Sequence, residues 1–401
     1  MRDKKRVVLA YSGGVDTTAC IPYLRHEMGC DYIVAMAADL GQGEELSVLQ
    51  RKAISAGADE SVVLDVRERF VVDFGFTALK ANAMYDRHYP LSSALGRPLI
   101  GELLVETAQA YDCGSVAHGA TGKGNDQIRM DMAVQLLDPS LQILAPAREW
   151  PYSRSETIAF SEAHGIAAHV TKERPWAIDV NVLGRNIEAG PIEDLLWEPT
   201  EEVWAMTAGP EDTPDQAEYV SVGFTHGIPD SIDGRAYAPV DLVQELNRIA
   251  GRHGVGRIDM IENRVVGVKS RELYEAPGIS VLLMAHAELE NLTLPPDVLS
   301  QKHMIDVAYA HLIYQGFWHG PLREAFSAFV EATQRNVTGV IGVRLQRGSA
   351  RVVTRSSPNS LYRHDLVTYG SSCRFDETSA VGFIDIFGLS SRVWTSAQAH
   401  S

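Results

Sequence analysis

The chain is poor in cysteine and has no long apolar run. Its four cysteines are scattered and lack the close pairing of zinc or dithiol sites: Cys20, Cys30, Cys113 and Cys373. Unpaired thiols are typical of a reducing compartment, so we expect a cytoplasmic protein. No apolar stretch approaches the roughly 18 residues of a membrane span, and the charged residues 2–5 lead directly into a strand-like run. We therefore expect neither a signal peptide nor a membrane partner.

Positive charge is scarce as well. The 36 Lys and Arg residues are outnumbered by 52 Asp and Glu residues, which gives a net charge of −16. An acidic surface disfavours nucleic acid and anionic membranes as partners. A polyanionic ligand must then be held by a local group of donors. With 401 residues, of which 45% are apolar, the chain can form two or three domains.

The sequence patterns change near residue 171. Before it, strand and helix patterns alternate, with strands at 6–9, 32–38, 61–65, 114–118 and 141–145, and helices at 43–56, 99–111, 125–137 and 153–164. This alternation predicts an α/β domain with a doubly wound parallel sheet at residues 1–170. Beyond it we expect an α+β synthetase domain at 171–375, with strands at 219–224 and 236–239, helices at 240–251, 280–293 and 300–315, and a hairpin of 337–345 with 349–355. Residues 376–401 are expected to form a helical oligomerisation arm.

The first motif, Ser12-Gly13-Gly14-Val15-Asp16, lies between a predicted strand and a predicted helix. Glycines allow positive φ angles, so the backbone N–H groups of such a turn can surround an anion at the helix N-terminus. The hydroxyls of Ser12, Thr17 and Thr18 add donors, and Asp16 can cap the helix or help to hold a metal-bound phosphate. The motif resembles the pyrophosphate loop of ATP pyrophosphatases. An ordinary strand-to-helix turn, and a serine-hydrolase elbow one substitution away, are the alternatives.

The second motif follows the predicted strand at 114–118. Its glycine-rich loop, residues 119–124, opens a helix that begins with Asn125 and Asp126. Thr121 and Asn125 offer donors to a carboxylate or phosphate, and Asp126 can accept from an ammonium group. Arg129 follows Asn125 by four residues, so both lie on one helix face. This combination suits an amino acid, although a glycine-rich loop before a capped helix is the simpler alternative.

Taken in order, these and later segments resemble the argininosuccinate synthase family. The resemblance rests on segments 38–45, 118–129, 251–259, 262–264, 269–278 and 360–362 and spans nearly the whole chain. It implies a ligase that condenses citrulline with aspartate through a citrulline adenylate, releasing AMP and pyrophosphate from ATP in arginine biosynthesis. It also implies Mg²⁺ on the phosphates and a homotetramer.

The resemblance further implies roles for individual residues. It places ATP at Ala10, Tyr11, Ser12, Gly13, Gly14, Val15, Asp16, Thr17, Thr18, Ala38 and Gly119. It places aspartate at Thr121, Asn125 and Asp126, and citrulline at Tyr89, Asn125, Arg129, Glu262 and Tyr274. Catalytic roles fall on Ser12, Asp16, Asp126 and Arg129, and no metal ligand is identified. Arg129 suits a carboxylate, which it can bind with two hydrogen bonds, and Glu262 suits an ammonium group.

Three positions depart from the family pattern, which has hydroxyl residues where this chain has Ala94, Ala177 and Asn186. A lost neutral hydrogen bond weakens binding several-fold without abolishing it. A related aspartate-dependent ligase with a different ureido or amide acceptor therefore stays an alternative. A catalytically silent nucleotide-binding protein is a second alternative, which the retained Asp16, Asp126 and Arg129 disfavour.

Overall fold

The structure is a computed structural model, and it describes residues 5–43, 46–149, 154–164 and 175–399. The chain forms two compact units, Met1–Asn359 and Ser360–Ser401. No helix among these described residues is long and apolar enough to cross a membrane.

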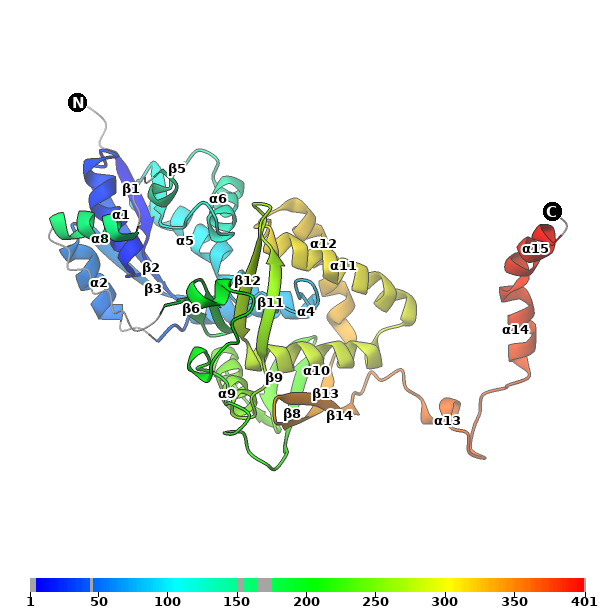
Figure 1. Cartoon of the computed structure of the whole chain (residues 1–401). Helices are drawn as coiled ribbons and strands as arrows, with labels where there is room; N and C mark the ends of the chain where they lie inside the picture. The colour runs from blue at the N-terminus through cyan, green and yellow to red at the C-terminus, as the bar shows by residue number, and fades with distance from the viewer. Residues whose placement is uncertain (1–4, 44–45, 150–153, 165–174, 400–401) are drawn as a thin grey trace. The chain divides into compact units, whose positions relative to one another are not determined.

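The first unit begins with a five-stranded parallel sheet of order β3-β2-β1-β4-β5 (Figure 1). Its strands are β1 (Arg6–Ala10), β2 (Tyr32–Asp39), β3 (Glu60–Asp65), β4 (Ser115–His118) and β5 (Gln142–Leu144). The helices of this part are α1 (Val15–His26), α2 (Leu46–Ser55), α5 (Gly96–Ala110), α6 (Asp126–Leu137), α7 (Pro146–Glu149) and α8 (Arg154–Ala163). The predicted α/β class is thereby confirmed.

The strand order reverses at β1. Ala10 pairs with Met36 of β2 on one side and with His118 of β4 on the other. At such a switch point the connections leave in opposite directions, so a crevice opens at the carboxyl ends of the two strands. Both sequence motifs follow these strands, and the fold therefore brings them to the same edge of the sheet.

The described residues in the rest of the first unit form two antiparallel sheets. One has the order β11-β12-β7-β6, with β6 (Ala177–Asn181), β7 (Gly184–Glu188), β11 (Arg257–Asn263) and β12 (Lys269–Glu275). The other has the order β10-β9-β8-β13-β14, with β8 (Glu218–Thr225), β9 (Ile228–Ile232), β10 (Arg235–Ala236), β13 (Gly339–Gln346) and β14 (Ser349–Ser356). The predicted hairpin is confirmed as β13 and β14. The predicted strand at 236–239 is confirmed at Ala236, which ends β10, and is wrong beyond it, because Pro239 begins helix α9 (Pro239–Arg252), where its fixed φ favours a first helical position.

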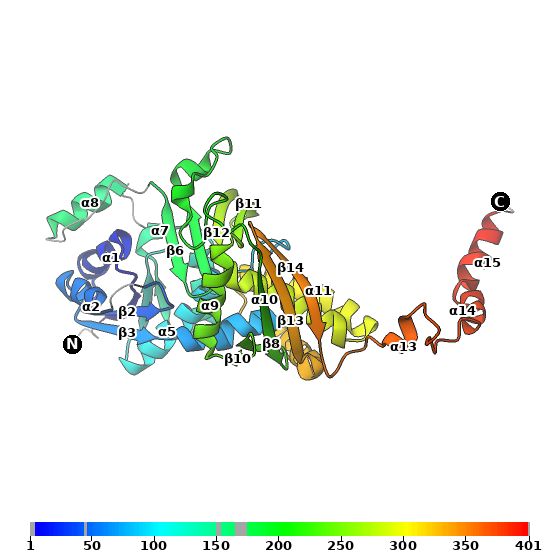
Figure 2. The ribbon, with the colours of Figure 1, turned by 90° about the horizontal axis from the view of Figure 1, so that it is seen from below.

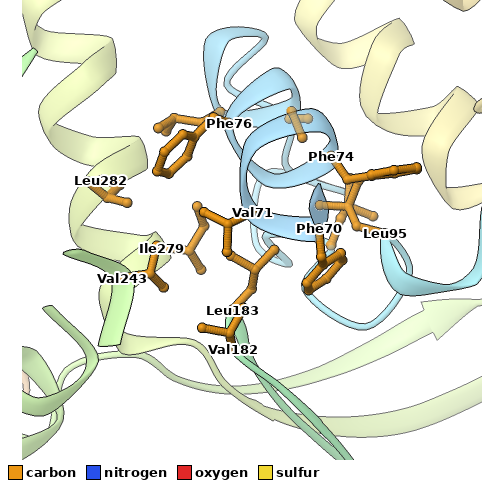
Figure 3. Packing of buried hydrophobic residues seen from close by; sticks show 14 of the residues in the cluster. Phe70, Val71, Phe74, Phe76, Leu95, Val182, Leu183, Val243, Ile279 and Leu282 are labelled. Atoms are coloured by element: carbon orange, nitrogen blue, oxygen red, sulfur yellow. The ribbon is translucent and has the colours of Figure 1, made fainter. Parts of the chain in front are cut away.

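Helices cover these sheets and complete the core. Helix α10 (Pro277–Thr293) packs against β13 and β14 (Figure 2), and α11 (Pro296–Tyr314) packs against α12 (Pro321–Thr333). After β3 the chain continues through α3 (Arg67–Arg69), a π-helix (Phe70–Phe76) and α4 (Thr77–Lys80). Figure 3 shows Val71 and Phe76 of this segment facing Ile279 and Leu282 of α10. The shared apolar core thus fixes the α/β part against the later sheets.

Over residues 360–399 the second unit forms three helices: α13 (His364–Val367), α14 (Ser379–Phe387) and α15 (Leu389–Gln398). The predicted helical arm is confirmed as secondary structure. Neither α14 nor α15 has a buried side chain, and large apolar side chains including Phe383, Ile386 and Trp394 are more than half exposed.

Candidate active site

The loop after β1 has the hydrogen bonding of a preformed turn. Gly13 has a φ of +74°, and a Cβ there would lie 2.3 Å from Leu49 Cδ2, so a side chain would strain the backbone and displace Leu49. The hydroxyl of Thr18 donates to the Gly14 carbonyl over 2.7 Å, and the Ser12 and Thr17 hydroxyls lie 3.0 Å apart. Two expectations are corrected here. Gly14, with φ −72° and ψ 167°, has no positive φ, and it takes the N-cap of α1 in place of Asp16, which lies in the first turn.

The loop after β4 lies against this turn. A Cβ on Gly119 would come within 3.0 Å of Thr17 Cγ2, so glycine permits the close approach of the two motifs. His118 fixes the start of the loop: its Nδ1 accepts from the Ala120 N–H at 3.2 Å, which leaves Nε2 to donate to Asp131 at 2.7 Å. The Gln127 amide donates to the Gly122 carbonyl over 2.6 Å. His118 and Gln127 therefore hold the loop backbone, without the side chains of Thr121 and Asn125.

One face of the β11-β12-β7-β6 sheet carries polar side chains. Asp179 pairs with Asn186, and Asn186 with Tyr274, so the three residues form a row across the sheet. Since side chains alternate between faces, Ala177, Glu188, Glu272 and Glu262 lie on the same face as this row. The opposite face carries Ile178, Ile187 and Leu273, which pack in an apolar cluster.

This polar face, the loop after β4 and the start of α6 enclose a cleft of about 240 Å³. The cleft is lined by Tyr89, Ser93, Arg97, Gly119, Ala120, Thr121, Gly124, Asn125, Asp126, Arg129, Ala177, Ile178, Asp179, Asn186, Glu188, Glu262, Arg264, Glu272 and Tyr274. Every residue expected to bind aspartate or citrulline lies on this wall. Residues 10–18 and Ala38 are not part of the lining, and Gly119 is the expected ATP residue that joins their loop to the cleft.

Arg97 lies between two carboxylates of the cleft. Its Nε is 2.8 Å from Asp126 Oδ2, and its Nη2 is 2.8 Å from Asp179 Oδ2. Arg129 Nη1 also donates to Asp126, over 3.2 Å. Burial opposes ionisation of Asp126, but the two guanidinium groups outweigh it and lower its pKa, whereas burial dominates at Asp179 and raises its pKa. Asp126 thus already has two cationic partners, which the sequence analysis did not foresee.

Glu262 receives two tyrosine hydroxyls. Tyr274 donates to one carboxylate oxygen, and Tyr314 donates to the other over 2.6 Å. The ring of Tyr89 stacks on that of Tyr274 with 3.9 Å between centroids, while its own hydroxyl accepts from two backbone N–H groups. Burial raises the pKa of Glu262, and the two tyrosine hydrogen bonds act in the opposite direction. Glu262 is 3% exposed, so its charge needs these donors.

A second arginine is shared by two more acids. Arg264 Nη2 lies 2.9 Å from Glu188 and 2.8 Å from Glu272, and its Nε donates to the Ser270 hydroxyl. Burial and the nearby Glu272 raise the pKa of Glu188 to about 8. This shift favours the protonated form of Glu188 at neutral pH.

Several cleft residues were missed by the sequence analysis. Arg264 and Glu272 stand inside segments that carry the family resemblance, and Asp179 follows the atypical Ala177 by two residues. No pattern around Arg97 or Glu188 sets them apart from surface charges. Of the three atypical positions, Ala94 is fully buried and absent from the lining, whereas Ala177 and Asn186 line the cleft.

The contacts of Asn125 differ from those of a simple helix cap, which was the alternative for the second motif. It is the N-cap of α6 but makes no side-chain capping hydrogen bond. Instead its amide donates to the Tyr314 hydroxyl over 2.9 Å and accepts from the Val265 N–H over 2.8 Å. The side chain is thus held at the cleft by contacts with distant segments.

A parallel sheet with a glycine-containing turn at its switch point, beside a cleft of paired charges, is the architecture of an α/β nucleotide-binding protein. The chain matches family models described as the arginosuccinate synthase N-terminal HUP domain, over residues 6–167, and the arginosuccinate synthase C-terminal domain, over residues 176–394. The chain belongs to the argininosuccinate synthase family.

Curated relatives agree with this assignment. The argininosuccinate synthase of Acaryochloris marina is 53% identical over 394 residues, covering 98% of this chain and 99% of its own length. That of Thermosynechococcus vestitus is 56% identical over 390 residues, with 97% of both chains covered. That of Synechococcus sp. strain RCC307 is 54% identical over 398 residues, with 99% of this chain and 98% of its own covered. The prediction of an ATP-binding ligase is confirmed, while the domain bounds and residue roles stay predictions.

Proposed function

We propose that this chain condenses citrulline with aspartate at the expense of ATP, forming argininosuccinate, AMP and pyrophosphate. The observation that carries the proposal is the cleft, whose wall contains every residue expected to bind the two amino acids. Family membership over nearly the whole chain supports the same reaction.

The charges of the cleft suit two amino acids. Its wall carries three guanidinium groups, Arg97, Arg129 and Arg264, and five carboxyl groups, Asp126, Asp179, Glu188, Glu262 and Glu272. The acids outnumber the arginines, so ligand ammonium groups reduce the repulsion within the cleft. The arginines offer charge-assisted hydrogen bonds to ligand carboxylates. A purely anionic ligand would gain much less here.

The proposed reaction has two displacement steps. The ureido oxygen of citrulline attacks the α-phosphorus of ATP, the bond from that phosphorus to the bridging oxygen breaks, and pyrophosphate leaves. The aspartate amine, having lost a proton, then attacks the ureido carbon, and the carbon–oxygen bond to AMP breaks. The chain contributes orientation and electrostatic stabilisation, because no covalent intermediate on a side chain is needed.

The turn of residues 12–14 and the N-terminus of α1 are proposed to hold the ATP phosphates through backbone N–H groups. Magnesium fits as a phosphate-bound ion: the described residues contain no group of three His, Cys, Asp or Glu that could hold a metal by themselves. Asp16, in the first turn of α1, is the carboxylate of this loop available to such an ion. When bound, the ion would neutralise the phosphate charge.

The alternative acceptor is disfavoured by where the atypical residues lie. Ala94 is fully buried, so its missing hydroxyl leaves the cleft surface unchanged. Asn186 replaces a hydroxyl by an amide, which both donates and accepts hydrogen bonds. Ala177, at the exposed start of β6, is the remaining polar loss, and one neutral hydrogen bond is worth about 0.5–1.5 kcal/mol. Citrulline therefore stays the acceptor that we propose.

The test is pyrophosphate release from ATP and aspartate, measured with and without citrulline and followed by identification of the products. We expect citrulline-dependent release with equimolar AMP and argininosuccinate. Release that is indifferent to citrulline would overturn the assignment, and release that requires another ureido or amide compound would support the related ligase.

We also propose a cytoplasmic homotetramer. The family resemblance implies the tetramer, and the exposed apolar side chains of α14 and α15 suit contact with a neighbouring copy. Light scattering at micromolar concentration should give about four times the 44.0 kDa chain mass. A monomer mass would contradict this proposal.

A further inference from the structure

Tyr314, the last residue of α11, contacts three residues of the cleft without lining it. Its hydroxyl donates to Glu262 Oε2 over 2.6 Å and accepts from Asn125 Nδ2 over 2.9 Å. Its carbonyl accepts from Arg129 Nε over 3.0 Å, and the Arg129 guanidinium lies 4.9 Å from its ring centroid. Tyr314 is 2% exposed, so the three side chains meet at a buried residue.

The end of α11 explains how one residue reaches so many partners. The Phe317 N–H bonds back to the Leu312 carbonyl, and Gly316 has a φ of +91°, which is the geometry of a Schellman-type helix end. A Cβ on Gly316 would lie 2.9 Å from Arg129 Cα, so glycine also permits the close approach of α6. The Tyr314 carbonyl belongs to the last helical turn, where carbonyls lack partners within the helix and attract cations. Arg129 occupies that position.

We propose that Tyr314 is a positioning residue for the amino-acid site. Its hydroxyl fixes the orientation of Glu262 and Asn125, and its carbonyl and ring fix Arg129. This inference rests on the proposed function, because Glu262, Arg129 and Asn125 are the residues expected to bind citrulline.

The two hydrogen bonds of the Tyr314 hydroxyl have a defined direction. A phenol has one proton, which goes to the Glu262 carboxylate, so Asn125 must donate its amide proton to the phenol oxygen. The amide orientation of Asn125 is thereby coupled to the ionised state of Glu262. A buried network of this kind is rigid when all its members are satisfied.

The matched variants are Tyr314→Phe and Tyr309→Phe. The first removes the hydroxyl but keeps the ring and carbonyl that hold Arg129. The second removes the hydroxyl of another buried tyrosine on α11, which bonds Ser327 at 2.8 Å and does not touch the cleft. Wild-type enzyme is assayed first for citrulline-dependent pyrophosphate release, so that failure of the proposed function is recognised separately.

We expect Tyr314→Phe to raise the KM for citrulline about tenfold, which corresponds to roughly 1.4 kcal/mol, with the KM for ATP changed by less than about twofold. Tyr309→Phe should leave both unchanged. An unchanged citrulline KM in Tyr314→Phe, or an equal rise for all three substrates, would overturn the inference. If Tyr314→Phe lowers thermal stability, its double-mutant cycle with Glu262→Gln still decides: non-additive effects on citrulline KM support coupling, and additive effects refute it.

The pH profile gives an independent readout. The charged and titratable groups facing Glu262 are Tyr274, Tyr314, Tyr85, Tyr89, Arg129, Arg264 and Glu272. The Tyr314 hydrogen bond lowers the pKa of Glu262, so its removal raises that pKa. The acidic limb of kcat/KM for citrulline should therefore move to higher pH in Tyr314→Phe and stay in place in Tyr309→Phe. An unmoved limb in an active Tyr314→Phe enzyme would refute the coupling.

Discussion

Replacing Asp126 by asparagine tests the central charge pairing of the cleft. The substitution removes the negative charge shared by Arg97, 2.8 Å away, and Arg129, 3.2 Å away, and leaves one amide oxygen as an acceptor for the two of them. Hydrogen bonds to charged groups are worth about 1.5–3 kcal/mol each. The Asp126 side chain is 38% exposed, so water replaces part of the lost hydrogen bonding. We therefore take the lower end of that range for the contacts with both arginines together. Asp126 is also the residue expected to accept from the ammonium group of aspartate, so we expect about tenfold weaker aspartate binding.

The three substrates should respond differently. Arg129 keeps the Tyr314 carbonyl at 3.0 Å, so the KM for citrulline should rise about threefold, as for loss of one weak hydrogen bond. The KM for ATP should stay unchanged, because residues 10–18 do not line the cleft. Each KM is measured by pyrophosphate release with the other substrates saturating. Asp259→Asn, which breaks a pair with Arg271 on the opposite face of the β11–β12 hairpin, is the control. Equal weakening of all three substrates would refute the reasoning.

Three further substitutions test separate features. Gly13→Ala should raise the KM for ATP much more than Gly14→Ala does, because only Gly13 combines a positive φ with a clash against Leu49; equal effects would contradict this. The raised pKa of Glu188, about 8 against an ordinary 4.5, means that stability from its protonated form is complete below 4.5 and is lost as the pH rises through 8. The melting temperature of Glu188→Gln should therefore rise relative to that of wild type as the pH increases from about 5 to 9. A difference that does not change with pH would argue against the raised pKa of Glu188. Ala177→Ser should lower the citrulline KM by about twofold, within the range of one exposed hydrogen bond, while a raised KM would favour a different acceptor.

The parallel sheet could be predicted because its central strands are apolar on both faces and alternate with helices. Val7, Val8 and Leu9 of β1 are fully buried, which gives a strong signal over few residues. The β6–β7 hairpin and the β11–β12 hairpin were not predicted. Their site-facing side chains are acids, amides and tyrosines such as Asp179 and Asn186, so the alternation of apolar and polar residues that marks a strand is weakened at the cleft.

The site could be predicted as two loops but not as a network. Of the first motif's glycines, Gly13 has the positive φ that was expected and Gly14 does not, while Gly119 of the second motif permits a close approach to Thr17. The partners of each side chain depend on contacts across long sequence separations, such as Arg97 with Asp179 and Asn125 with Tyr314. No local pattern encodes such pairs, and Tyr314 in particular looks like an ordinary core residue at the end of an apolar helix.

Under the proposed function, the pairing within the cleft lets an acidic site accept an acidic amino acid. Arg97 and Arg264 each lie between two carboxyl groups, so both guanidinium groups have hydrogen-bond partners within the cleft itself. A zwitterion brings a carboxylate that can replace one internal acceptor of an arginine and an ammonium that can take over the released acid. Such an exchange buries no net charge, and burial of unpaired charge is the main cost of a polar cleft. In the proposed reaction the second carboxylate of aspartate remains to be compensated, and the raised pKa of Glu188 lowers that cost, because a protonated Glu188 frees Arg264 for a ligand carboxylate.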